Sequence, residues 1–133
     1  MKVAEIMRTN LKTLRAEATV ADAVAALTEA QVSALPVLDG HGRAVGVCST
    51  RDVLVAESRY ASAEGRERLF EHALVLEIMT PWPRTVRPDE DVRAVAQRML
   101  DGKVQRFFVQ DQGRLVGVIS QTDIVAAVAA TRV

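Results

Sequence analysis

Two aspartates, Asp52 and Asp123, each follow a serine by three residues, at Ser49 and Ser120. An ionised carboxylate accepts hydrogen bonds from two neighbouring hydroxyl groups, so an aspartate aimed into a groove can hold the diol of a ribose. Each serine lies just before a stretch predicted to be helical, where free backbone N–H groups and the helix dipole favour an anion. The pairs therefore indicate a ligand that carries a sugar and a phosphate.

The same Ser-x-x-Asp spacing is that of a capping box, in which the two side chains satisfy backbone N–H groups at a helix N-terminus. Capping alone would explain either pair. A glycine stands three residues before each serine, at Gly46 and Gly117, and glycine permits close approach of the backbone to a ligand. Repetition of the whole pattern favours ligand binding by at least one pair, but the sequence leaves both interpretations open.

The chain contains two copies of one unit. Residues 46–52 (GVCSTRD) return at 117–123 (GVISQTD), and residues 3–7 (VAEIM) match 75–79 (VLEIM). The openings are 72 residues apart and the later segments 71, so one residue is lost between them, in the glycine-rich turn around Gly40. Hairpin turns tolerate such changes better than strands do. Duplication predicts a pseudo-twofold module with two equivalent sites where its halves meet.

Each copy should begin with a short helical turn and an extended piece, followed by an amphipathic helix. Thr19 and Asp22 have the spacing to cap the first amphipathic helix, and Asp91 takes that place in the second. Two strands and a second helix complete each copy, with strands expected at 34–38, 43–49, 106–110 and 114–120. This order predicts an α+β fold, with helices over one face of a small sheet.

These patterns divide the chain into a first unit at 1–56, a partly helical linker at 57–73 and a second unit at 74–133. The linker is expected to extend the preceding helix, break near Gly65 and form a short helix through Leu69.

The last helix, 124–130, is apolar all the way round, which is typical of a helix buried on more than one side. Homodimerisation through this helix is the preferred explanation, and burial against the linker is the alternative. Trp82, between two prolines, is expected to pack where the copies meet.

Composition predicts an ordinary cytoplasmic domain. Seventeen basic residues balance seventeen acidic ones, so no overall field attracts nucleic acid or anionic lipid. No apolar run has the length of a membrane span or of a signal peptide. Cys48 is the single cysteine, which suits a reducing compartment, and it should fill the core. His41 is expected in a turn, His72 on the linker helix and Cys48 in a strand, so these three side chains are not expected to form a metal site.

With Gly-hydrophobic-hydrophobic-Ser-x-x-Asp in both halves and Glu-Ile-Met opening each, the sequence resembles the cystathionine β-synthase (CBS) domain family. It looks like a stand-alone tandem CBS pair over residues 1–56 and 74–130. Residues 34–37 (ALPV), 79–81 (MTP) and 85–86 (TV) match the family as well. The resemblance implies two β-α-β-β-α units whose packed sheets leave two clefts. In the family these clefts commonly bind AMP, ADP, ATP or S-adenosylmethionine.

Carried over by motif, the resemblance implies ribose contacts from both aspartates and phosphate contacts from both serines. It places the adenine edge near Thr13 and Thr85. Arg51, inside the first motif, could add a phosphate contact, whereas the second copy has Thr122 there. The two sites are therefore predicted to differ, with the more anionic ligand at the site that uses Arg51. Alanine substitutions of the two aspartates should then have unequal effects.

The second copy departs from the family pattern at Phe108, which stands where the first has Pro36. A ring there could stack on an adenine or could plug the site. Arg106, at the start of the same strand, could point toward a phosphate or could be a solvated strand-end residue. The sequence does not choose between these alternatives.

The expected function is that of a cytoplasmic, non-catalytic regulatory module. It would bind an adenosine-containing ligand as a signal, with no required cofactor, and would pass the occupancy signal through a homodimer to an unknown effector protein. One rival is a ligand-free dimerisation scaffold. A second rival, a nucleotide hydrolase, is disfavoured because the motif serines lack a nearby base.

Overall fold

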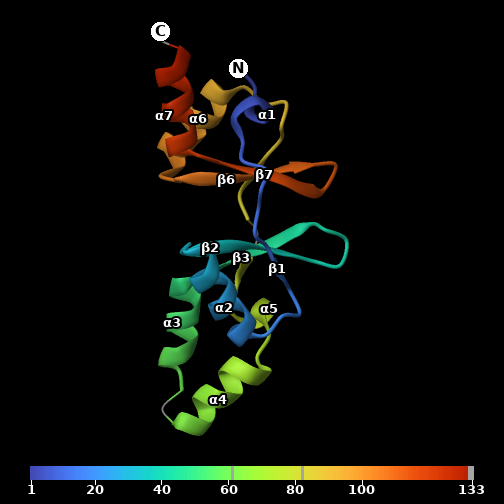
Figure 1. Ribbon diagram of the computed structural model, residues 1–133, viewed down its shortest axis with the longest axis vertical. Coiled ribbons are helices and arrows are strands. Elements are labelled where there is room, and N and C mark those ends of the chain that lie inside the picture. Colours follow the sequence, from blue (N-terminus) through green and yellow to red (C-terminus); the bar gives the residue numbers. More distant parts are fainter. Residues whose placement is uncertain (61, 82, 132–133) are drawn as a thin grey trace. The chain divides into compact units, whose positions relative to one another are not determined.

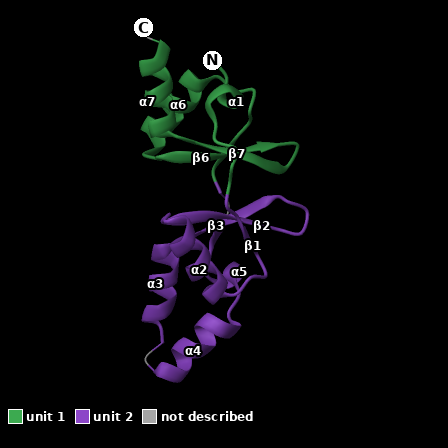
Figure 2. Ribbon diagram, in the orientation of Figure 1, with its two compact units in different colours: residues 1–11, 84–133 green, residues 12–83 purple. Residues whose placement is uncertain are grey.

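Figure 1 shows a computed structural model of the chain, which describes residues 1–60, 62–81 and 83–131. The predicted packing of Trp82 lies outside these residues. The chain forms two compact units, coloured in Figure 2. Unit 2 is Lys12–Pro83, and unit 1 combines Met1–Leu11 with Arg84–Val133.

Unit 2 contains a four-stranded sheet in which β1 runs parallel to β2 and the other pairs are antiparallel. Its strands in spatial order are β1 (Leu14–Arg15), β2 (Ala34–Leu38), β3 (Ala44–Ser49) and β4 (Thr80–Pro81). Its helices are α2 (Val20–Ala30), α3 (Thr50–Ser58), α4 (Ala63–His72) and α5 (Val75–Ile78). Apolar side chains from the sheet and from helices α2 and α5 form its core, including Leu27, Val37 and Cys48.

Unit 1 repeats this architecture with a three-stranded sheet, again parallel in its first pair and antiparallel in its second. The strands in spatial order are β5 (Thr85–Val86), β6 (Arg106–Asp111) and β7 (Arg114–Ser120). The helices are α1 (Val3–Ile6), α6 (Val92–Gly102) and α7 (Gln121–Thr131). Val95, Phe107 and Ile119 are among its core residues. The predicted α+β class and the strand-helix-strand-strand-helix order of each copy are confirmed.

The compact units do not follow the sequence boundaries at 1–56, 57–73 and 74–133, because the two copies exchange their opening segments. Met1–Leu11 belongs with the second copy, and residues 74–83 belong with the first. Arg8 and Val118 exchange two backbone hydrogen bonds, of 2.8 and 2.9 Å, at the free edge of β7. In unit 2, β4 takes the corresponding place beside β3.

Gly46 and Gly117 lie where the exchanged segments cross their sheets. A Cβ atom on Gly117 would lie 2.7 Å from Met7 Sδ and 2.9 Å from the Arg8 carbonyl oxygen. A Cβ atom on Gly46 would lie 2.6 Å from Met79 Sδ. All three distances are shorter than van der Waals contact allows. The glycines therefore admit the exchanged chain segment, and close approach of a ligand to them stays a prediction.

The linker differs from its prediction in where the helix breaks. Helix α3 ends at Ser58 and α4 begins at Ala63, so the predicted break between two helices is present a few residues before Gly65, which itself lies inside α4. The reason is local, because the Ser62 hydroxyl accepts a hydrogen bond from Gly65 N (3.0 Å) and caps the new helix. Leu69 of α4 is buried, as part of a cluster with Val20 and Ala56.

Helix caps confirm one prediction and correct another. Thr19 and Asp22 form the expected capping box at α2, with reciprocal hydrogen bonds of 3.0 and 3.2 Å. Asp91 occupies the N-cap position of α6, but its side chain makes no capping hydrogen bond. Its carboxylate instead lies 3.9 Å from the N-terminal amine of Met1.

The hairpin turns have the expected conformation. Gln112 and Gly113 both have positive φ angles, 51° and 80°, which two-residue hairpin turns require. The longer turn of the first copy is held by Asp39, whose carboxylate accepts hydrogen bonds from the backbone N–H groups of His41 and Arg43.

The length and composition of a helix decide whether it can cross a membrane. Across the part of the chain that the structure describes, no helix combines the length and the apolar character that crossing a bilayer requires.

Candidate ligand-binding site

The first Ser-x-x-Asp pair lies at the junction of β3 and α3. The Ser49 hydroxyl accepts a hydrogen bond from Asp52 N (3.1 Å). In return, Asp52 Oδ2 accepts hydrogen bonds from the backbone N–H and the hydroxyl of Ser49, both at 2.9 Å. The predicted capping box is therefore present, and it uses one of the two carboxylate oxygens. The Ser49 hydroxyl hydrogen is engaged here, so its predicted phosphate contact stays a prediction.

The second carboxylate oxygen of Asp52 has a different partner. The hydroxyl of Thr80, on strand β4, donates to Asp52 Oδ1 at 3.0 Å. Asp52 is half-buried and Thr80 is exposed. We call Ser49, Asp52 and Thr80 the Asp52 corner. Its Oδ1 atom is the acceptor that an incoming hydroxyl group could reach.

The second Ser-x-x-Asp pair has the same capping geometry at the junction of β7 and α7. Asp123 Oδ2 accepts hydrogen bonds from Ser120 N and Ser120 Oγ, both at 2.9 Å, and Asp123 N donates to Ser120 Oγ at 3.2 Å. The other oxygen is occupied by an arginine, because Arg8 Nε donates to Asp123 Oδ1 at 2.8 Å. We call Ser120, Asp123 and Arg8 the Asp123 corner.

Exposure differs sharply within this ion pair. The side chain of Asp123 is 7% exposed, whereas that of Arg8 is 71% exposed. Burial raises the pKa of Asp123, but hydrogen bonds from Arg8 and Ser120 outweigh burial, so the pKa lies below its ordinary value of 3.8. At neutral pH Asp123 is therefore an ionised acceptor, and each of its oxygens is already in use.

Strand register brings several predicted residues of unit 1 to one face of its sheet. Arg106 lies opposite Ser120, and Phe108 pairs with Thr85. Side chains alternate along a strand, so Arg106 and Phe108 lie on the face opposite to core residue Phe107. Phe108 is only 6% exposed and Arg106 is exposed. Their contacts with adenine and phosphate stay predictions.

Thr13 occupies the corresponding place in unit 2, immediately before β1. It is exposed and lines a hollow of about 240 Å³ with residues of helix α2, including Ala26 and Glu29. Pro36, the counterpart of Phe108, pairs with Val47 on β3. The adenine contacts predicted for Thr13 and Thr85 are not tested by these positions.

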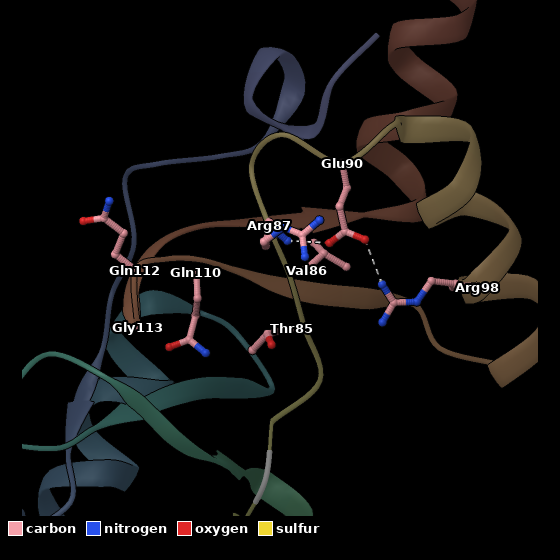
Figure 3. Close-up of a pocket in the computed structure, with 8 residues that line it drawn as sticks. All are labelled: Thr85, Val86, Arg87, Glu90, Arg98, Gln110, Gln112 and Gly113. Atoms are coloured by element: carbon pink, nitrogen blue, oxygen red, sulfur yellow. Dashed lines mark hydrogen bonds and ion pairs between the residues drawn. The ribbon is translucent and has the colours of Figure 1, made fainter.

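Thr85 also lines the hollow drawn in Figure 3, about 390 Å³ in volume, near the β6–β7 turn. Figure 3 shows Thr85 and Gln110 on one side of the sheet, and Glu90 and Arg98 on the other. Arg98 Nη1 lies 3.2 Å from Glu90 Oε1, so these charges neutralise each other. None of the Asp123 corner residues lines this hollow.

Arg51 and Thr122, the predicted source of asymmetry, lie in the first turns of α3 and α7, and both are exposed. Within the described residues Arg51 forms no ion pair. A larger asymmetry was missed by sequence reasoning, namely Arg8 at one corner and Thr80 at the other. The signal was present, since each follows the methionine of Ile-Met, but only the exchange of opening segments shows which aspartate each one meets.

Cys48 lies in the core of unit 2, fully buried, as expected. Burial, with a smaller contribution from the charge of Asp52, raises the pKa of its thiol to about 11. Over the residues that the structure describes, no three His, Cys, Asp or Glu side chains gather as metal ligands.

We predict that Cys48 resists alkylation in the folded chain, because the reactive thiolate is scarce at pH 8 and the sulfur is enclosed. Iodoacetamide labelling followed by mass spectrometry should show rapid modification in 6 M guanidinium and at least about tenfold slower modification in buffer, as the raised pKa implies. Equal rates in the two conditions would contradict the buried position.

The family model of the CBS domain matches the chain twice, at residues 3–59 and 75–130. The chain belongs to the CBS domain family. Its two matched segments are the two sequence copies, so each compact unit is one CBS unit completed by the opening segment of the other copy.

Among curated proteins, the chain is similar to the chloroplastic CBS domain-containing protein CBSX2 of Arabidopsis thaliana. The two are 28% identical over 141 residues, which cover 90% of this chain and 59% of CBSX2. Protein MJ1225 of Methanocaldococcus jannaschii is 26% identical over 123 residues, 92% of this chain and 41% of that protein. This chain thus spans 41–59% of the length of these two relatives.

Among solved structures, CBSX2 in complex with AMP is similar with a TM-score of 0.81 and 28% identity, covering 99% of this chain and 98% of that one. The CBS domain of a bacterial CNNM/CorC family Mg²⁺ transporter with ATP gives 0.78 and 25%, covering 97% and 87%. The CBS domain pair of MJ0100, in complex with 5-methylthioadenosine and S-adenosyl-L-methionine, gives 0.74 and 25%, covering 96% and 99%. The predicted tandem CBS fold is confirmed.

Proposed function

We propose that this chain is a non-catalytic sensor that binds an adenosine-containing ligand at its Asp52 and Asp123 corners. The observation that carries the proposal is the hydrogen bond that Asp52 Oδ1 accepts from the hydroxyl of exposed Thr80, at 3.0 Å. A ribose hydroxyl can replace that hydroxyl with a hydrogen bond of the same kind, so the exchange costs little.

Similar structures support adenosine as the ligand class. CBSX2 was solved with AMP, the transporter CBS domain with ATP, and the MJ0100 pair with 5-methylthioadenosine and S-adenosylmethionine. The part common to these molecules is adenosine, whose ribose carries a diol except where substituted. For this chain AMP, ADP, ATP and S-adenosylmethionine all remain within the proposal, as regulatory ligands and not as cofactors.

Other predicted residues have proposed roles, each in the unit to which it belongs. Arg51, in the first turn of α3, would supply a phosphate contact that needs no change at Ser49. Thr13 and Thr85 would meet the adenine edge. Arg106 would serve phosphate in unit 1, because its strand register places it opposite Ser120.

A thermal-shift experiment tests the proposal, because a ligand that binds only the native state raises its melting temperature. AMP, ATP or S-adenosylmethionine should raise it and GMP should not. No shift with any adenosine compound would favour the ligand-free scaffold. Sustained hydrolysis of ATP by the purified chain would favour the enzyme instead.

We also propose a homodimer through helices α6 and α7. Leu100, Val125 and Val128 are 68%, 67% and 52% exposed, although all three are apolar. Leu100 and Val125 line a mainly apolar hollow of about 160 Å³ between the two helices. Covering this face removes apolar surface from water, and ligand-dependent changes at that interface could reach an effector protein.

Val125→Glu should shift the chain from dimer to monomer, because the substitution would bury a charge in an apolar interface. Sedimentation equilibrium should show at least about tenfold weaker association, corresponding to about 1.4 kcal/mol or more. Gln112→Glu, exposed in the β6–β7 turn and outside this face, makes the same change in net charge and is the control. Unchanged association of Val125→Glu, or a monomeric parent chain, would contradict the interface.

A further inference from the structure

Arg8 and Thr80 are structural counterparts with different chemistry. Each follows a methionine that packs over a glycine, Met7 over Gly117 and Met79 over Gly46. Each also sends its side chain to the Oδ1 atom of the aspartate in its own unit, at 2.8 Å from Arg8 and 3.0 Å from Thr80. The position is therefore a built partner of the carboxylate, and its residue type distinguishes the two corners.

The partners differ in how readily a ligand can replace them. The Thr80 hydroxyl forms a hydrogen bond of the kind that a ribose hydroxyl would form, so replacement is an exchange of like for like. The Arg8 guanidinium carries a full positive charge, so its bond to the Asp123 carboxylate adds an ionic attraction that a neutral hydroxyl does not supply. The Asp123 side chain is also 7% exposed, so a diol reaches it only when the arginine moves away.

We propose that Arg8 is an intramolecular competitor of the ligand, which makes the Asp123 corner the weaker of the two and sets the order in which they fill. Asp52 accepts its ligand first, and Asp123 accepts ligand only at higher concentration. The Arg8 side chain, 71% exposed, has room to leave, so the Asp123 corner is restrained and not blocked. This inference rests on the proposed adenosine-binding function.

Adenosine is the suitable probe, because it carries the diol and lacks a phosphate that could attract Arg8 by itself. The Asp123 corner is measured in a chain that carries Asp52→Ala, and the Asp52 corner in one that carries Asp123→Ala. Isothermal titration calorimetry gives the affinity of each corner separately. Circular dichroism and melting temperature establish that each variant is folded.

Exchange of the two counterparts is the decisive comparison. Arg8→Thr should raise the adenosine affinity of the Asp123 corner about threefold to tenfold. The ion pair joins an exposed arginine to a buried carboxylate, so its interaction energy should lie between that of a surface ion pair and that of a buried one. Thr80→Arg should lower the affinity of the Asp52 corner by a similar factor. Unchanged or weaker binding after Arg8→Thr would overturn the proposal, because Arg8 would then be neutral or a ligand contact.

The same experiment separates this inference from the proposed function. AMP binding by the parent chain, combined with no gain of adenosine affinity in Arg8→Thr, overturns the competitor role alone. Failure of AMP, ATP, S-adenosylmethionine and adenosine to bind the parent chain and every variant overturns the sensor function together with the competitor.

Discussion

Asp52→Ala is expected to lower the affinity of the chain for AMP by tenfold or more, measured by titration calorimetry. The ribose diol would lose an ionised acceptor, and a hydrogen bond to a charged group contributes about 1.5–3 kcal/mol. A loss of 1.4 kcal/mol already corresponds to tenfold. The same substitution also removes the α3 capping box, so its effect on folding needs a control of its own.

Asp22→Ala is a matched control, because Asp22 holds the same capping-box position at α2 and has no proposed ligand contact. It should weaken folding in a similar way and leave AMP affinity unchanged. Asp123→Ala should reduce AMP binding less than Asp52→Ala does, because Arg8 already engages the Asp123 carboxylate. Equal losses at the two corners would contradict the asymmetry, and a loss in Asp22→Ala would assign the effect to capping.

Gly117→Ala is expected to lower the free energy of unfolding by about 1–3 kcal/mol, the usual cost of overpacking. The added methyl group would lie 2.9 Å from the Arg8 carbonyl oxygen and 2.7 Å from Met7 Sδ. The methionine can move. The carbonyl cannot do so without straining the two backbone hydrogen bonds between Arg8 and Val118.

Gly40→Ala provides the comparison, since a Cβ atom there would meet nothing within 4 Å. Urea unfolding should show a lower midpoint for Gly117→Ala, an unchanged midpoint for Gly40→Ala, and similar slopes for all three chains. A midpoint for Gly117→Ala equal to that of the parent would mean that the exchanged segment does not pack on β7 as described.

Much of the fold could be predicted from the sequence because its signals are local. Hydrophobic periodicity located the α2 helix, and Thr19 and Asp22 marked its start. The glycine-rich turns located the hairpins. The exchange of opening segments could not be predicted, because residues 3–7 and 75–79 are nearly alike and either could pack on either copy. Which sheet edge each segment joins depends on long-range contacts.

The local part of the candidate site was also predictable from the sequence, and its long-range contacts were not. Ser-x-x-Asp identified both strand–helix junctions and both capping boxes. The partners of the remaining carboxylate oxygens were not predictable, since Arg8 and Asp123 are 115 residues apart and belong to different sequence copies. The contacts of the motif glycines were not predictable for the same reason, because the atoms next to them come from the exchanged segment.

We expect Asp52, at the β3–α3 junction, to receive the ribose diol, and the sugar itself provides the test. Calorimetric titration should compare AMP with 2′,3′-dideoxy-AMP, which keeps the adenine and the phosphate and lacks both hydroxyls. We expect the dideoxy compound to bind at least about tenfold more weakly to the parent chain, and the two compounds to bind alike when Asp52 and Asp123 are both alanine. Equal affinity of the parent chain for the two nucleotides would contradict the account.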